Sequence, residues 1–302
     1  MSAPTAQQDS GDLWQEITNH IHASTGSRVD FQSRQPIHGG CINETWCLGA
    51  SDDVYFVKVS GADRLPMLTA EADGLVELIS SNAIRVPKPV CWGAASYRSY
   101  LVLEYIEFSS GSNPVVFAQE LAALHQITAS RFGWKRDNTI GSTPQINTWS
   151  DNWVDFWRNH RLGYQLELAG RSSHQGSLLV KGERLLAEFP PLFSDYRPQP
   201  SLLHGDLWSG NWGLDDDHNP VIFDPAVYYG DRETDLAMTE LFGDPGAGFY
   251  AAYNDMLPLD PGYGVRKIFY NVYHLLNHMN LFGGGYSRQA ERAIDAVLGE
   301  LR

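Results

Sequence analysis

Hydrophobic residues recur with a helical period near the start of the chain. Leu13, Ile17 and Ile21 are spaced every four residues, with mostly polar residues between them. This spacing places the three side chains on one face of a helix. Ser10 and Gly26, which flank the run, are residue types that begin and end helices. The pattern predicts a leading amphipathic helix.

Short segments rich in β-branched and aromatic residues follow, and such runs are typical of strands. They are residues 37–48, interrupted by Gly39 and Gly40, and residues 54–59, 90–92 and 100–103. A helical stretch, residues 66–79, lies between the second and third runs, with a proline at its start, where a missing N–H costs nothing. We therefore expect a small antiparallel sheet crossed by one helix.

Beyond residue 106 the pattern changes to helices. Helical periods cover residues 115–126, 149–163, 176–188 and 266–281, and only residues 212–224 have the pattern of a hairpin. Trp149, Trp153 and Trp157 repeat every four residues, which favours a buried stripe on one helix over a sugar-binding surface.

The predicted fold class is α+β, with two lobes. The N-lobe, residues 1–105, is a small antiparallel sheet with one crossing helix and ends at a hinge. The C-lobe, residues 106–302, is larger and mainly helical. A ligand is expected in the cleft between the two lobes.

Composition narrows the class of protein and its compartment. The chain has 22 Lys and Arg against 36 Asp and Glu, a formal net charge of −14, so we expect no nucleic-acid partner. No apolar run approaches the roughly 18 residues of a membrane span, and the first eleven residues lack the pattern of a signal peptide. Three cysteines without a CxxC pair suit a reducing compartment. We expect a cytoplasmic protein with no membrane partner.

One carboxylate lies on the apolar face of the predicted helix 66–79. Glu71 shares that face with three leucines, and an unpaired buried carboxylate would cost about 3–5 kcal/mol. Lys58, near the end of the strand at 54–59, is the candidate partner. Kinases use a strand lysine paired with a helix glutamate to hold the phosphates of ATP. An unpaired surface lysine and a helix-edge glutamate would have the same sequence pattern.

A more specific signal is the run His-Gly-Asp-Leu-Trp-Ser-Gly-Asn at residues 204–211, followed by Asp224. Phosphoryl transfer needs a carboxylate that orients or deprotonates the attacking hydroxyl, and oxygen ligands for Mg²⁺. Asp206, Asn211 and Asp224 have the order and spacing of these groups in kinases. With the lysine and glutamate pair, they predict a kinase that acts on the hydroxyl of a small molecule.

Six stretches of the chain are similar to a known family. They are residues 39–42, 132–133, 137–145, 203–211, 223–242 and 273–278, of which 203–211 and the block 227–238 are the most specific. On these stretches the chain resembles the fructosamine kinase family, which includes fructosamine-3-kinases and ketosamine-3-kinases. This family belongs to the aminoglycoside phosphotransferase-like branch of the protein-kinase-like fold. The resemblance implies ATP-dependent phosphorylation of the O3 hydroxyl of a fructosamine or ribulosamine, free or protein-bound, as a deglycation repair step.

The resemblance also implies roles for individual residues. Asp206 would be the catalytic base, and Asn211 and Asp224 the Mg²⁺ ligands. Lys58 would bind phosphate with Glu71 as its partner. The adenine would meet backbone groups of the hinge at Glu104, Tyr105 and Ile106. The phosphate loop would contain Gly39, Gly40 and Cys41, although its sequence departs from the GxGxxG of protein kinases. The expected cofactors are ATP and Mg²⁺.

Three other residues carry more limited expectations. Trp208, two residues after the predicted base, is expected near the acceptor, and Asp235 in a buried network that supports the catalytic loop. Cys41 is a candidate redox switch, because backbone N–H groups and bound cations favour a thiolate; the alternative is a small side chain needed where phosphate approaches. We therefore expect a monomer or a redox-dependent homodimer. Cys47 and Cys91, in strands, are expected to be buried and inert.

Two other functions stay open at this point. The first is a kinase of the same fold for another acceptor, such as an aminoglycoside, choline or a free sugar, against which the block 227–238 argues. The second is a nucleotide-binding pseudokinase that serves as a scaffold. Pseudokinases usually lack an ion-pair or metal group, whereas all of these groups are present here.

Overall fold

A five-stranded sheet and two helices form the N-terminal part of the structure, called here the N-lobe. The computed structural model describes residues 6–37, 42–50, 53–171 and 176–301. The strands are β1 (Gln35–Ile37), β2 (Glu44–Ala50), β3 (Asp53–Gly61), β4 (Pro89–Ala95) and β5 (Arg98–Glu104), and the helices are α1 (Ala6–Thr25) and α2 (Leu65–Ser81). The strand order is β1-β2-β3-β5-β4, and every neighbouring pair is antiparallel. The predicted sheet, leading helix and crossing helix are confirmed.

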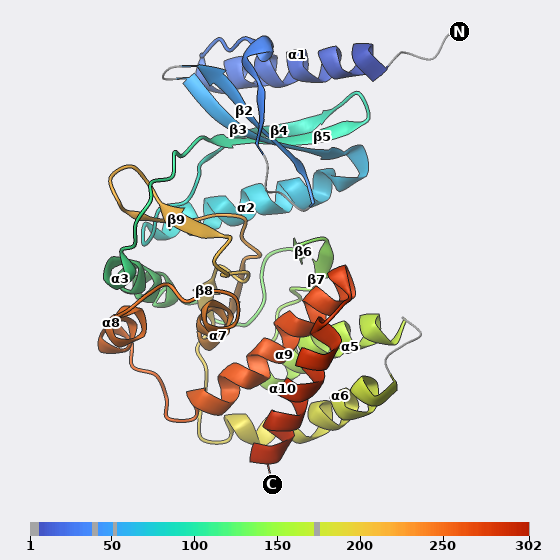
Figure 1. The fold of residues 1–302 in the computed structure, drawn as a ribbon, viewed down its shortest axis with the longest axis vertical. Helices are drawn as coiled ribbons and strands as arrows, with labels where there is room; N and C mark the ends of the chain where they lie inside the picture. The colour runs from blue at the N-terminus through green and yellow to red at the C-terminus, as the bar shows by residue number, and fades with distance from the viewer. Residues whose placement is uncertain (1–5, 38–41, 51–52, 172–175, 302) are drawn as a thin grey trace.

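The sheet separates two layers of side chains, because alternate residues of a strand point to opposite faces. On β3, Val57 and Val59 are buried against α1, whose Ile17 and Ile21 belong to the same cluster. Lys58, between the two valines, points to the other face, where α2 packs against β4 and β5. Figure 1 shows α1 and α2 on opposite sides of the sheet.

The remainder of the chain, called here the C-lobe, is mainly helical. Its helices are α3 (Pro114–His125), α4 (Trp153–Trp157), α5 (Gly163–Gly170), α6 (Gly176–Glu188), α7 (Glu233–Leu241), α8 (Phe249–Met256), α9 (Tyr263–Phe282) and α10 (Tyr286–Glu300). Helices predicted at 115–126, 176–188 and 266–281 are confirmed. None of the helices in the described ranges combines the length and apolarity needed to cross a bilayer.

Three pairs of short strands lie among these helices. They are β6 (Asn138–Ile140) with β7 (Thr143–Gln145), β9 (Trp212–Leu214) with β10 (Pro220–Ile222), and β8 (Ser201–Leu203) with β11 (Tyr228–Gly230). The pair β9 and β10 confirms the hairpin predicted at 212–224. The expectation that this hairpin is the only one is wrong, because strands of three residues are too short to show a period of two.

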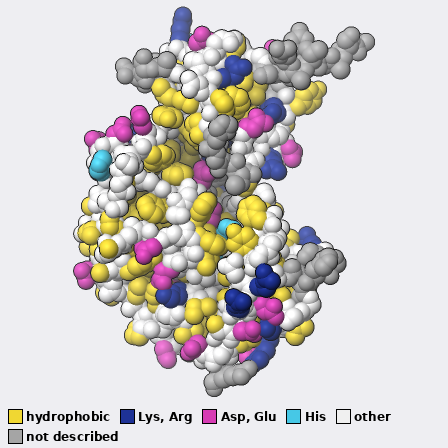
Figure 2. Space-filling model, in the orientation of Figure 1, with side chains coloured by type: hydrophobic (Ala, Val, Ile, Leu, Met, Phe, Trp, Pro, Cys, Tyr) yellow, Lys and Arg dark blue, Asp and Glu magenta, His cyan; other side chains and the backbone are white. Residues whose placement is uncertain are grey.

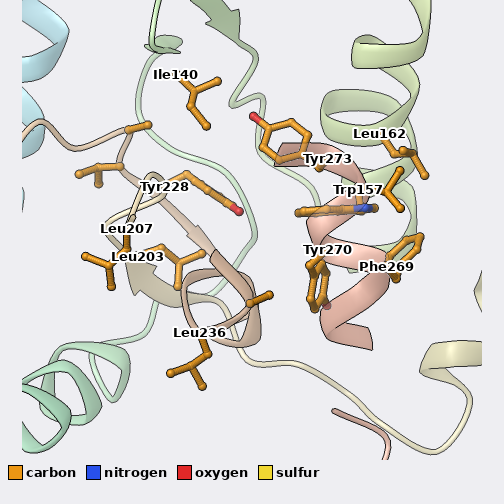
Figure 3. Packing of buried hydrophobic residues seen from close by; sticks show 14 of the residues in the cluster. Ile140, Trp157, Leu162, Leu203, Leu207, Tyr228, Leu236, Phe269, Tyr270 and Tyr273 are labelled. Atoms are coloured by element: carbon orange, nitrogen blue, oxygen red, sulfur yellow. The ribbon is translucent and has the colours of Figure 1, made fainter. Parts of the chain in front are cut away.

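Aromatic side chains fill the core of the C-lobe. The ring of Trp157 lies 4.8 Å from that of Tyr270 and 5.4 Å from that of Tyr273, and Figure 3 shows these rings gathered in one cluster near Tyr228. The guanidinium of Arg161 is buried in this cluster, 4.1 Å from the ring centre of Tyr228. The core thus holds α9 and β11 together, and both lie beside the site described below.

The helix predicted at 149–163 begins four residues later, at Trp153, and continues through a π-helical turn into α5. The side chain of Asn152 caps it by accepting an N–H of the first turn at 3.0 Å. Trp149 is therefore not on the predicted stripe. Its ring stacks on that of Tyr229, with 6.1 Å between centroids.

Replacing Leu75 in α2 tests how strongly this helix is held to the sheet. Leu75 is fully buried, so Leu75→Ala should lower the free energy of unfolding by about 2–5 kcal/mol. The neighbouring Val76 is 49% exposed, and Val76→Ala should change stability by no more than about 0.5 kcal/mol. Urea denaturation of the two variants measures the difference. Equal losses would mean that α2 is not packed as described.

Candidate active site

A buried lysine joins the two lobes. Lys58 projects from β3, and 5% of its side chain is exposed. Its Nζ lies 2.7 Å from Oε1 of Glu71 on α2 and also donates to the carboxylate of Asp224, which follows β10 in the C-lobe. Burial alone would lower the pKa of Lys58, but the charges of Asp224 and Glu71 outweigh burial and raise the pKa above its ordinary value. The predicted pair is thus formed by a charged lysine, and Asp224 is its second partner.

Asp206 lies in the loop that follows β8. The amide nitrogen of Asn211 donates to the backbone carbonyl of Asp206 at 2.9 Å and to its carboxylate at 3.2 Å, so the five-residue spacing closes the loop on itself. Burial and the charge of Asp224 raise the pKa of Asp206 to about 7, against the opposing effect of Asn211. A carboxyl group with this pKa can accept a proton near neutral pH.

The backbone before Asp206 requires a glycine. Gly205 has a φ of +84°, and a Cβ at this position would lie 2.1 Å from the carbonyl oxygen of Ala226. The N–H of Ala226 in turn donates to the carbonyl of His204 at 2.8 Å. These contacts press the loop against the segment that follows Asp224. Asp206 and Asp224, the two aspartates predicted from the sequence, therefore lie close together.

A buried acid holds this loop in place. Asp235 in α7 accepts the N–H groups of His204 at 2.8 Å and Gly205 at 2.9 Å, and it contacts Nε2 of His125 on α3 at 3.2 Å. Burial opposes ionisation of Asp235, but these hydrogen bonds prevail and lower its pKa. The network expected around Asp235 is present. Nothing in the sequence marked His125, a histidine at the end of an apolar helix.

His204 has a defined tautomer. Its Nε2 lies 2.9 Å from the carbonyl of Phe223, which can only accept, so Nε2 carries the proton. Its Nδ1 then accepts the N–H of Asp206 at 3.2 Å. Burial lowers the pKa of His204, which keeps the ring neutral in this arrangement. The histidine thus links the catalytic loop to the segment just before Asp224.

The oxygen atoms of the predicted Mg²⁺ ligands suit a hard cation. The amide nitrogen of Asn211 is bonded to Asp206, which leaves its Oδ1 for a ligand. The side chain of Asp224 is 48% exposed. Asp224 lies close enough to Asp206 to raise its pKa, and it shares Lys58 with Glu71. A divalent cation would balance the excess negative charge. Among the described residues no group of three or more His, Cys, Asp and Glu side chains could hold a metal.

The predicted adenine-binding hinge lies where the chain leaves β5. The backbone N–H of Glu104 donates to the carbonyl of Lys88 at 2.8 Å, and the Glu104 carboxylate pairs with Arg85 at 3.0 Å. The N–H of Glu104 is therefore already bonded. The backbone carbonyl of Glu104 and the backbone groups of Tyr105 and Ile106 stay the predicted contacts of the adenine.

Trp208 lies at the outer edge of the catalytic loop. Its side chain is 38% exposed, and its ring covers Gly210, where a Cβ would lie 2.2 Å from the indole. Ser209 donates its N–H and its hydroxyl to the carbonyl of Phe242, whose ring lies 4.5 Å from that of His278. Figure 2 shows a hollow between the lobes, bordered by hydrophobic and acidic side chains. The contact of Trp208 with the acceptor stays a prediction.

The structure describes two of the three cysteines, Cys47 and Cys91. Gly39, Gly40 and Cys41 lie outside the described residues, so the phosphate loop and the redox switch stay predictions. Cys91 is buried in β4, as expected, whereas Cys47 in β2 is only half-buried, so the expectation of its burial is wrong. Burial raises the pKa of both thiols, that of Cys91 to about 12. Because the thiolate is the reactive form, this favours the expected inertness of both.

Comparison with known proteins gives the family. The fructosamine kinase family model matches residues 13–300. This chain belongs to the fructosamine kinase family. A protein of Synechocystis sp. named probable ketoamine kinase is 48% identical, over 94% of this chain and 97% of its own length. The chloroplastic protein-ribulosamine 3-kinase of Oryza sativa subsp. indica is 42% identical, over 92% of this chain and 82% of its own length.

Solved structures share the fold. A candidate fructosamine-3-kinase from Haemophilus somnus has a TM-score of 0.86 at 30% identity, covering 96% of this chain and 98% of that chain. A thermostable mutant of the aminoglycoside phosphotransferase APH(4)-Ia has a TM-score of 0.61 at 15% identity, covering 94% of this chain and 98% of that chain. The second likeness concerns the fold alone. The predicted α+β, kinase-like fold is confirmed.

Replacing Asp206 by Asn should stabilise the metal-free protein at high pH. The folded-state pKa of about 7 exceeds the ordinary value of 3.8, so the favourable contribution of this carboxyl group to folding is present below pH 3.8 and lost as the pH rises through 7. At pH 8 with EDTA, Asp206→Asn should raise the free energy of unfolding by up to about 4 kcal/mol, the equivalent of three pKa units. Near pH 4 the difference should vanish.

Urea denaturation at the two pH values measures this effect. The control is Asp216→Asn, in an exposed turn, which should behave like the wild type at both. An Asp206→Asn variant no more stable than the wild type at pH 8 would contradict the described environment of Asp206.

Proposed function

We propose that this chain is an ATP-dependent kinase that transfers a phosphoryl group to the O3 hydroxyl of a ketosamine, a sugar joined to an amine by an Amadori linkage. The observation that carries the proposal is the charged Lys58, held jointly by Glu71 and Asp224 beside Asp206. A buried cation between two lobes suits the phosphates of a nucleotide. Membership of the family, with relatives named ketoamine kinase and ribulosamine 3-kinase, supports the acceptor.

The nucleotide would bind between residues 1–105 and residues 106–302, which we propose as the two functional lobes. Lys58, oriented by Glu71, binds phosphate oxygens. Asn211 and Asp224 hold Mg²⁺, which supplies positive charge to the phosphates. Two further parts of the chain would complete this side of the site. The backbone carbonyl of Glu104 and the backbone of Tyr105 and Ile106 would meet the purine, and Gly39, Gly40 and Cys41 would meet the phosphates.

The acceptor would bind on the side of the catalytic loop. Asp206 accepts the proton of the O3 hydroxyl, and the oxygen forms a bond to the γ-phosphorus while the bond to the β-phosphate oxygen breaks and ADP leaves. Burial of Asp206, the larger cause of its raised pKa in the metal-free protein, would make it a stronger base than an ordinary aspartate. Trp208 packs against the sugar, where its exposed indole can cover a ring face.

We also propose a compartment and an assembly state. The cysteine content supports a reducing, cytoplasmic location. In that compartment the protein would be a monomer, and oxidation of Cys41 would join two chains. The buried thiol of Cys91 supports Cys41 as the reactive cysteine.

A panel of acceptors tests the reaction. ADP release is measured with Mg²⁺ and ATP in the presence of fructosamine, ribulosamine and erythrulosamine, with aminoglycosides and choline for comparison. ³¹P NMR of the product locates the phosphate. ADP release should require a ketosamine, and the phosphate should be on O3. Turnover with choline or an aminoglycoside but with no ketosamine would contradict the proposal.

Two substitutions test the assigned roles. Asp206→Asn should lower kcat by about 10² to 10⁴, the usual contribution of a positioned base, with little change in ADP affinity. Asp224→Ala should abolish Mg²⁺-dependent turnover, because a metal ligand is removed. Asp216→Asn serves as the control and should retain full activity. Near-normal kcat in Asp206→Asn would remove Asp206 from the mechanism.

A further inference from the structure

Helix α2 carries two carboxylates that do not face Lys58. Asp73 and Glu77 are four residues apart and share a face of the helix. Oδ2 of Asp73 lies 2.7 Å from Nη1 of Arg136. Oε1 of Glu77 accepts the hydroxyl of Tyr229 at 2.8 Å, and Oε2 lies 3.3 Å from Nζ of Lys135. These three partners belong to the C-lobe, so α2 is bonded to both lobes.

The partners of α2 form one unit of the C-lobe. The N–H of Gly133 donates to the carbonyl of Tyr229 at 2.9 Å, and the N–H of Tyr229 donates back to the carbonyl of Gly133 at 2.8 Å. Gly133 has a φ of +124°, and a Cβ there would lie 2.6 Å from the carbonyl of Asn147, so this segment cannot shift freely. The ring of Trp149 stacks on the ring of Tyr229 in the same unit. Lys135 and Arg136 follow Gly133 in the chain, after Trp134.

This unit is continuous with the segment that bears Asp224. Tyr229 is five residues further along the chain, in β11. Between them, Val227 meets α2 itself, since a Cβ on Gly74 would lie 3.2 Å from Cγ2 of Val227. One face of α2 therefore rests on the C-lobe, while Glu71 reaches Lys58 in the N-lobe.

We propose that Tyr229 and Arg136 are positioning residues of the nucleotide site: by binding Glu77 and Asp73, they hold α2 where Glu71 can reach Lys58. This inference rests on the proposed nucleotide-binding function. If the hold on α2 is loosened, Glu71 samples positions away from Lys58, and the lysine is left with Asp224 alone. Part of the free energy of nucleotide binding is then used to re-form the pair of Lys58 and Glu71. Affinity for the nucleotide falls, whereas the acceptor side of the site is untouched.

The test removes one hydroxyl group. Tyr229→Phe keeps the ring that stacks on Trp149 and deletes only the hydrogen bond to Glu77. The matched control is Tyr263→Phe, which deletes a 2.7 Å tyrosine–glutamate hydrogen bond to Glu240 between α9 and α7, away from α2. The Kd for ADP with Mg²⁺ is measured by calorimetry, together with the thermal midpoint and the KM values for ATP and for the ketosamine.

Tyr229→Phe should raise the Kd for ADP and the KM for ATP by about 3- to 20-fold, as expected when a hydrogen bond to a charged group is partly lost from a binding-competent state. The KM for the ketosamine should not change. Tyr263→Phe should leave all three values within twofold of the wild type. If Tyr229→Phe lowers the thermal midpoint while the Kd stays within twofold, or if both variants weaken binding equally, the inference is overturned.

Exchanging the charges of Asp73 and Arg136 is a second, independent test of the proposal. Asp73→Arg and Arg136→Asp should each raise the Kd for ADP, and the double variant should return it towards the wild-type value because the pair is restored with its charges reversed. Lack of any recovery in the double variant would count against Arg136. A wild-type protein that does not bind ADP would refute the proposed function itself, which is a different result from an unchanged Kd in Tyr229→Phe.

Discussion

The burial of Lys58 is the constraint on which the rest of the site depends. An unpaired ammonium group inside a protein costs several kcal/mol, so carboxylates must reach it. Glu71 comes from α2 and Asp224 from the C-lobe, so neither lobe satisfies the lysine alone. The register of β3, the position of α2 and the turn after β10 are therefore coupled through one charged group. Arg85 repeats this arrangement at the hinge, where it pairs with Glu104 and Asp215.

The position of Asp224 in the C-lobe is unfavourable in two respects, its backbone conformation and its closeness to a second aspartate. Asp224 itself has a φ of +56°, a conformation that residues other than glycine rarely adopt, and the neighbouring loop passes through the left-handed Gly205. Asp206 and Asp224 are close enough for one charge to raise the pKa of the other. Two backbone N–H groups of the loop donate to Asp235, and His204 donates to the carbonyl of Phe223, which holds the loop in this arrangement. Burial is the larger source of the basicity that we propose for Asp206, and the charge of Asp224 adds to it in the metal-free protein.

The sequence predicts those parts of the site that follow from a local period or a compact motif. The helical period of α2 puts Glu71 on the apolar face, where a buried carboxylate needs a cation, and this indicated Lys58 as its candidate partner. The contact of Lys58 with Glu71 confirms that pairing. By contrast, His125 and Tyr229 bind carboxylates 110 and 152 residues away, and no local pattern indicates such a pairing. The strands β6 and β7 escaped prediction because three residues do not make a period. Trp149 was misplaced because a capping residue, Asn152, starts the helix after it.

A crystal structure of the chain with Mg²⁺ and a non-hydrolysable ATP analogue tests the central claim most directly. The account predicts that Nζ of Lys58 contacts phosphate oxygens while keeping its bond to Glu71. It also predicts that the carboxylate of Asp224 and Oδ1 of Asn211 both coordinate the metal. A nucleotide bound elsewhere, or bound between the lobes with Lys58 directed away from its phosphates, would contradict the account.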